Sequence, residues 1–283
     1  MSGTRPAALT STEWLHAHRA DPGVRILDGS FHLPGSGRNA WEEFRRCHIP
    51  GAQFFDIDGI RDESTDLPHM LPPAEVFAAK VGAFGIGNDD HVVVYDVMPG
   101  SGAARVWWTF RVFGHGKVTV LDGGLGKWLA EGRPVSEDSA ETRPVTYRIP
   151  TLDRALVRTR AELIANLQTG QEQVVDNRSA GRFSGAEPEP RPARKGGHVP
   201  GSINMPFVDF FAPSGVWRSV EELAEIFARA GVDLNRPIVS TCGSGVTACT
   251  TALAAFLLGH DRAAVYDGSW AEWGNRDDTP VER

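Results

Sequence analysis

A cysteine opens a glycine-rich loop near the C-terminal end of the chain. Residues 239–248, Val-Ser-Thr-Cys-Gly-Ser-Gly-Val-Thr-Ala, predict a strand, a tight turn and the start of a helix, with Cys242 first in the turn. Glycines let successive backbone amides point toward one centre, and a helix N-terminus adds the positive end of its dipole. Such a loop binds an anion and favours a thiolate, so Cys242 is predicted to be a nucleophile. The alternative is a buried core cysteine at the end of a strand.

The residue six positions after the cysteine separates two chemistries that use such a loop. Cysteine phosphatases need an arginine there to clamp phosphate, and this chain has Ala248. A sulfur-transfer site needs only to stabilise a persulfide anion, which backbone amides can do. We therefore predict sulfur transfer, and we expect the Thr247 hydroxyl to cap the helix and to hydrogen-bond the persulfide, with ordinary capping as the alternative. The predicted binding groups are Gly243, Gly245, Val246 and Thr247.

The elements that position this loop occur twice in the chain. An apolar segment ending in Asp, a His-x-Pro-Gly turn, a strand and an Asp-Gly turn recur in the same order at a spacing of about 150 residues. This repeat predicts an N-terminal non-catalytic domain over residues 1–135, a linker over 136–158 and a C-terminal catalytic domain over 159–283. The matching segments are 25–28 with 173–176, 48–52 with 198–202, 91–96 with 237–242, and 118–123 with 263–268.

Each copy has the pattern of an α/β domain. Short β-branched runs such as 92–95 and 238–240 alternate with segments of helical period, and the clearest helix follows Gly245. This alternation predicts two tandem domains, each a mainly parallel sheet with helices on both faces. The first copy has Asp96 where the second has Cys242, so we expect it to contribute groups across the domain interface without transferring sulfur itself.

Composition and charge exclude several classes of protein. The 283 residues carry 29 Lys and Arg against 36 Asp and Glu, a net charge of −7, which argues against a nucleic-acid partner. No apolar run reaches the roughly 18 residues of a membrane span, and residues 1–12 do not resemble a signal peptide. Three cysteines without a Cys-x-x-Cys pair predict a reducing compartment, the cytoplasm. Without a nucleotide-binding motif or metal-ligand spacing, no cofactor and no metal are predicted.

The duplicated domains, Asp96 in the place of the cysteine and the Cys-Gly-Ser-Gly-Val-Thr loop together resemble a two-domain rhodanese. Within that superfamily the sequence is most similar to the 3-mercaptopyruvate sulfurtransferases, and the resemblance runs from Trp14 to Trp273. Thiosulfate sulfurtransferases of this superfamily typically carry an Arg and a Lys directly after the cysteine, which suit a dianion. Gly243 and Ser244 take those places here, which favours a monoanionic 2-oxo acid as the sulfur donor.

The resemblance also implies two arginines that bind the donor. Arg182 and Arg191 would hold its carboxylate and carbonyl, for which the guanidinium fork is suited. The alternative is that both are solvated loop arginines paired with Glu187 and Glu189.

A relay between the domains is implied in the same way. Asp58 would orient His69, and His69 would hydrogen-bond the hydroxyl of Ser244, with the logic of a Ser/His/Asp array. The alternative for His69 is an exposed side chain in a Pro-rich loop.

The predicted reaction is a double displacement. Cys242 would take sulfur from 3-mercaptopyruvate and release pyruvate, and the persulfide would then pass its outer sulfur to thioredoxin, a small thiol or cyanide. Two alternatives stay open: thiosulfate as the donor, or a non-catalytic module that carries a persulfide for a partner.

Overall fold

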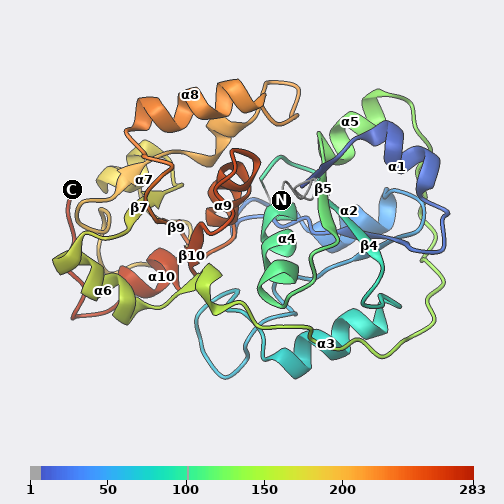
Figure 1. The fold of residues 1–283 in the computed structure, drawn as a ribbon, viewed down its shortest axis with the longest axis horizontal. Helices are drawn as coiled ribbons and strands as arrows, with labels where there is room; N and C mark the ends of the chain where they lie inside the picture. The colour runs from blue at the N-terminus through green and yellow to red at the C-terminus, as the bar shows by residue number, and fades with distance from the viewer. Residues whose placement is uncertain (1–7, 101) are drawn as a thin grey trace, which may run out of the picture.

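Two α/β domains lie side by side in the computed structural model, which describes residues 8–100 and 102–283. Figure 1 shows the first domain in blue to green and the second in yellow to red, with α4 (Ala103–Val112) and α9 (Ala248–Leu257) between them. The expectation that residues 1–12 form no signal peptide falls in part on residues 1–7, which lie outside the described residues.

Each domain contains a five-stranded sheet, and the two sheets share one topology. The strand orders are β1-β5-β4-β2-β3 and β6-β10-β9-β7-β8, and the strands pair in parallel throughout. The matching order confirms the predicted α/β class and the duplication. The first sheet contains β1 (Leu9–Thr10), β2 (Val24–Asp28), β3 (Ala52–Phe54), β4 (His91–Tyr95) and β5 (Val118–Leu121), and the second contains β6 (Val157–Arg158), β7 (Gln173–Asp176), β8 (Ile203–Asn204), β9 (Ile238–Thr241) and β10 (Ala264–Tyr266).

Helices cover both faces of each sheet because strand side chains alternate between two apolar layers. Val94 of β4 packs into the core that spans both domains, whereas the next residue, Tyr95, packs into a separate core on the other face. Ile238 and Val239 of β9 divide in the same way. The remaining helices are α1 (Thr12–His18), α2 (Ala40–Arg46), α3 (Ala74–Ala83), α5 (Gly124–Ala130), α6 (Arg160–Thr169), α7 (Ala180–Ser184), α8 (Val220–Ala230) and α10 (Ser269–Trp273), with short 3₁₀ turns η1 (Arg154–Leu156) and η2 (Phe207–Phe210).

One apolar core joins the two domains through α4 and α9. Trp107 of α4 packs edge-on against Phe256 of α9, with ring centroids 5.4 Å apart. The guanidinium of Arg111 lies 4.5 Å from the centre of the same Phe256 ring, and its Nη2 donates to the carbonyl of Asp261 at 3.1 Å. This shared core fixes how the loops of one domain face those of the other.

The chain between the two sheets is mostly irregular. Residues 137–153 carry no helix or strand, while the last two residues of the proposed linker form β6 in the second sheet. Among the described residues, no helix has the length and apolar character needed to cross a bilayer.

Candidate active site

Cys242 directly follows β9, the central strand of the second sheet. Its side chain is buried, its amide donates to Oγ of Ser269 at 3.2 Å, and its carbonyl accepts from the amide of Trp270 at 3.0 Å. The sheet and the start of α10 therefore fix the position of the cysteine backbone.

The loop amides after Cys242 are free to bind an anion. Within the part of the chain that the structure describes, the backbone amides of residues 243–247 donate no hydrogen bond. Gly245 has a φ of 79°, and a Cβ there would lie 2.7 Å from the carbonyl of Asp267, so the turn requires glycine. Free amides beside the N-terminus of α9 suit a negatively charged sulfur.

Thr247 does not cap the following helix as the sequence predicts. It occupies the N-cap position of α9, but its φ of −71° and ψ of −18° are helical, and its side chain makes no capping hydrogen bond. A capping side chain needs an extended N-cap residue to reach the amides of the next turn. The helix begins at Ala248, so Val246 and Thr247 belong to the turn, and Thr247 lines the same pocket as Cys242.

The matching loop of the first domain binds the carboxylate of its own residue Asp96. Asp96 follows β4, and its carbonyl accepts from the amide of Leu125 at 3.0 Å, as that of Cys242 accepts from Trp270. Its Oδ2 also accepts from the amides of Gly102 and Ala103, at 3.2 and 3.0 Å, where α4 begins. The carboxylate thus occupies the anion position of its own loop, and the first copy carries no thiol there.

Cys242 faces a pocket of about 580 Å³ that both domains line. Residues from segments 31–38 and 98–100 of the first domain meet residues 207–211 and the loop of the second. Two arginines line the pocket, and each already has a carboxylate partner: Arg38 pairs with Glu43 at 2.7 Å and Arg182 with Glu189 at 2.5 Å. The positive charge offered to a ligand is therefore partly neutralised.

The two arginines predicted to bind the donor occupy different places. Arg182 lies against the loop, because a Cβ on Gly243 would be 2.6 Å from its Nη2. Arg182 therefore lines the pocket, as expected of a donor-binding residue. It also forms the ion pair with Glu189 that the alternative interpretation predicts. Arg191 is not among the described residues that line the Cys242 pocket; its Nη2 lies 3.1 Å from Nε2 of His69.

His69 is buried, and the structure aligns it with Asp58 and Ser244. Its Nε2 lies 2.8 Å from Oδ1 of Asp58, and its Nδ1 lies 3.1 Å from Oγ of Ser244. Because an ionised carboxylate only accepts, Nε2 donates to Asp58; in the neutral ring with this tautomer, Nδ1 accepts from the Ser244 hydroxyl. The hydrogen bond from His69, with the nearby charge of Arg191, outweighs desolvation and lowers the pKa of Asp58. The alternative of an exposed surface histidine is wrong.

Comparison with known proteins gives the family. The pattern of the Rhodanese-like domain matches residues 11–131 and 159–276. The chain belongs to the rhodanese family. This rhodanese is 47% identical over 272 residues to the 3-mercaptopyruvate sulfurtransferase of Homo sapiens, which covers 94% of this chain and 91% of the relative. It is also 47% identical over 273 residues to the thiosulfate sulfurtransferase of Cricetulus griseus, with the same coverage.

A solved structure agrees with the relatives. The 3-mercaptopyruvate sulfotransferase SseA from Escherichia coli superposes with a TM-score of 0.84 at 34% identity, over 94% of this rhodanese and 100% of that chain. These similarities confirm the predicted superfamily, the tandem fold and an enzyme that transfers sulfur.

Sequence reasoning missed one pair of residues in this rhodanese. Arg105 of α4 and Asp267 after β10 form a buried ion pair behind the loop that follows Cys242. The repeated Asp-Gly turn marked Asp267 as part of the duplication, but Arg105 stood in an apolar helix with no visible partner.

Proposed function

We propose that this rhodanese transfers sulfur from 3-mercaptopyruvate to a thiol or to cyanide through a persulfide on Cys242. The observation that carries the choice of donor is the Ser244 hydroxyl, aligned with His69, in a loop without charged side chains. The relatives do not separate the donors, because a 3-mercaptopyruvate and a thiosulfate sulfurtransferase are equally similar to this chain.

The charges around Cys242 favour a monoanionic donor. Thiosulfate carries two charges, and both arginines of the pocket are already paired with glutamates. A 2-oxo acid carries one carboxylate, and Arg182 has further N–H groups that do not contact Glu189. We propose that Arg182 binds this carboxylate. The buried Nε of Arg191, which has no hydrogen-bond partner among the described residues, supports a role for this arginine at the donor carbonyl.

The proposed first step breaks the carbon–sulfur bond of the donor. The Cys242 thiolate attacks the sulfur, a sulfur–sulfur bond forms, and the bonding electrons leave with the carbon as the enolate of pyruvate. A proton then reaches this enolate to give pyruvate. The Ser244 hydroxyl, whose oxygen lies between the pocket and His69, is proposed to move this proton while Asp58 holds the imidazole.

The second step returns the cysteine to its starting state. A thiolate or cyanide attacks the outer sulfur, and the Cys242 thiolate leaves. With cyanide the product is thiocyanate; with a thiol it is a persulfide, from which a second thiol releases sulfide. Thioredoxin or a small thiol is the proposed acceptor. The three free cysteines fit a reducing compartment, and the cytoplasm is the proposed location.

The test compares both donors in parallel assays. Pyruvate release from 3-mercaptopyruvate with a thiol acceptor is measured beside thiocyanate formation from thiosulfate and cyanide. Cys242→Ser should abolish both reactions, and Cys47→Ser, which removes a half-buried thiol of the first domain, is the matched control. A larger kcat/KM with thiosulfate would refute the donor assignment, and a stable persulfide without turnover would point to the carrier module.

A further inference from the structure

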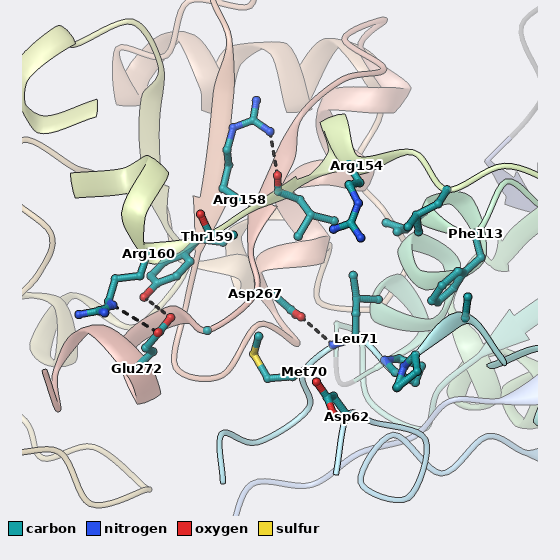
Figure 2. A pocket seen from close by; sticks show the side chains of 18 of the residues that line it. Asp62, Met70, Leu71, Phe113, Arg154, Arg158, Thr159, Arg160, Asp267 and Glu272 are labelled. Atoms are coloured by element: carbon teal, nitrogen blue, oxygen red, sulfur yellow. Dashed lines mark hydrogen bonds and ion pairs between the residues drawn. The ribbon is translucent and has the colours of Figure 1, made fainter. Parts of the chain in front are cut away.

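A buried ion pair lies behind the catalytic loop, at the interface of the two domains. Arg105 and Asp267 are each 3% exposed, and Nη1 of Arg105 lies 2.6 Å from Oδ1 of Asp267. The other carboxylate oxygen, Oδ2, accepts from the amide of Leu71 at 2.7 Å, as Figure 2 shows. Asp267 therefore binds both the first domain's helix α4 and the segment that follows His69.

The same guanidinium contacts both halves of the proposed relay. Its Nη1 donates to the carbonyl of Gly245 at 3.2 Å, and its Nη2 donates to the carbonyl of His69. Gly245 is the neighbour of Ser244 in the chain. A guanidinium is planar with fixed donor directions, so one side chain sets the relative positions of three acceptors.

The segment at His69 needs such support because its backbone is not relaxed. His69 has a φ of 61°, which residues with a side chain seldom adopt. Residues held in sparsely populated conformations persist only where the surrounding structure fixes them. Packing does not enclose this segment, because Met70, Leu71 and Asp267 also line a second cavity of about 630 Å³ between the domains (Figure 2).

We propose that Arg105 is a positioning residue that, with Asp267, sets the distance between the imidazole of His69 and the hydroxyl of Ser244. It acts through the backbones of His69 and Gly245. Burial opposes the charge of Arg105, but the contact with Asp267 outweighs it and raises the pKa, so the guanidinium stays charged beside that carboxylate. This inference rests on the proposed function, because it assigns Arg105 to the relay.

The variant that tests the proposal has to leave no unpaired buried charge. Arg105→Met alone would leave the Asp267 carboxylate buried without its partner, which is strongly destabilising. The double variant Arg105→Met/Asp267→Asn removes both charges and keeps an acceptor for the Leu71 amide. We expect its kcat for pyruvate release to fall on the order of tenfold to hundredfold, because the relay is displaced, with a smaller change in KM. Urea unfolding of the same preparation shows that the protein is folded.

A double-mutant cycle separates positioning from a general loss of structure. Introduced into Ser244→Ala, the same two changes should lower kcat by less than about twofold, because the contact that they serve is already absent. Losses that multiply in the combined variant would overturn the proposal. Arg105→Lys should recover little activity, because an ammonium group pairs with Asp267 but does not reproduce the fork.

A control variant lies on the same helix. Arg111 also joins the domains, through Phe256 and the carbonyl of Asp261, and within the described part of the chain it forms no hydrogen bond with His69 or Gly245. Arg111→Met should keep kcat within about twofold of the parent enzyme. If Arg111→Met lowers kcat as much as the Arg105 variant, domain docking in general is responsible and the proposal fails.

The variant Ser244→Ala separates failure of the relay from failure of the positioning role. If Ser244→Ala alone keeps full kcat, the proposed relay itself fails. If Ser244→Ala lowers kcat but the Arg105 variant does not, only the positioning role is refuted.

Discussion

The Nδ1 atom of His69, in the first domain, lies 3.1 Å from the Oγ atom of Ser244, in the second. The two residues are 175 positions apart in the sequence, and Asp58 extends the row at 2.8 Å from the other ring nitrogen. Each domain by itself contains only part of this arrangement, so the proposed proton transfer depends on how the domains dock.

Changes to this relay should affect the two donors differently. In His69→Gln, kcat for pyruvate release should fall on the order of hundredfold, because general acid–base catalysis is lost while the Cys242 loop is unchanged. Thiosulfate releases sulfite, which needs no proton at carbon, so its reaction with cyanide should fall much less. Steady-state rates with both donors decide this, and an equal loss with both would contradict the relay.

The residues after the cysteine should set the donor preference. Gly243→Arg/Ser244→Lys adds two cations beside Cys242 and should shift the ratio of kcat/KM values toward thiosulfate on the order of tenfold. A side chain at position 243 also displaces Arg182, since a Cβ there would lie 2.6 Å from Nη2. Gly245→Ala is the contrasting variant: its strained φ of 79° should impair both reactions. A double variant with unchanged preference would remove the charge argument for the donor.

The carboxylate of Asp58 should make the free energy of unfolding depend on pH in the acidic range. The hydrogen bond from His69 lowers its pKa from the ordinary 3.8, so near that pH the folded state binds fewer protons than the unfolded state. Its contribution is complete above pH 3.8 and is lost as the pH falls through the lower, folded-state pKa. Asp58→Asn should therefore be less stable at about pH 7 and lose less stability on acidification to about pH 3.

Urea unfolding at the two pH values measures this difference. Asp66, exposed in the same loop, provides the control: Asp66→Asn should follow the parent protein at both pH values. A parallel loss of stability in the parent and in Asp58→Asn would show that the Asp58–His69 contact does not contribute in solution.

The carboxylate of Asp96 in the first domain should contribute to the stability of the fold. Asp96→Ala removes the acceptor of the Gly102 and Ala103 amides and should lower the free energy of unfolding by about 1–3 kcal/mol. Asp96→Asn keeps an acceptor oxygen and should lose less. Thermal or urea unfolding of the two variants gives the comparison, and equal stability of the parent and Asp96→Ala would show that the loop does not need its anion.

The sequence determined the features that depend on neighbouring residues. Cys242 after a β-branched strand, the glycines that permit the turn, and the replacement by Asp96 in the first copy are all visible in short segments, and the duplication repeats them. The short β-branched runs 92–95 and 238–240, which alternate with segments of helical period, were sufficient to predict parallel strands, because a strand buried on both faces carries apolar residues at successive positions. The predicted helix cap at Thr247 is wrong, because the residue type suits a cap but its backbone is helical.

Only the tertiary structure decided which distant side chains meet. The resemblance suggested the row from Asp58 through His69 to Ser244, but the distances exist because α4 and α9 pack in one orientation. That packing also placed Arg191 beside His69, and it gave Arg105 its partner Asp267 in the other domain. Apolar packing is not directional, so no residue pattern specifies the docking angle of two domains. The angle is set by the fit of whole surfaces, and the polar contacts across the interface follow from it.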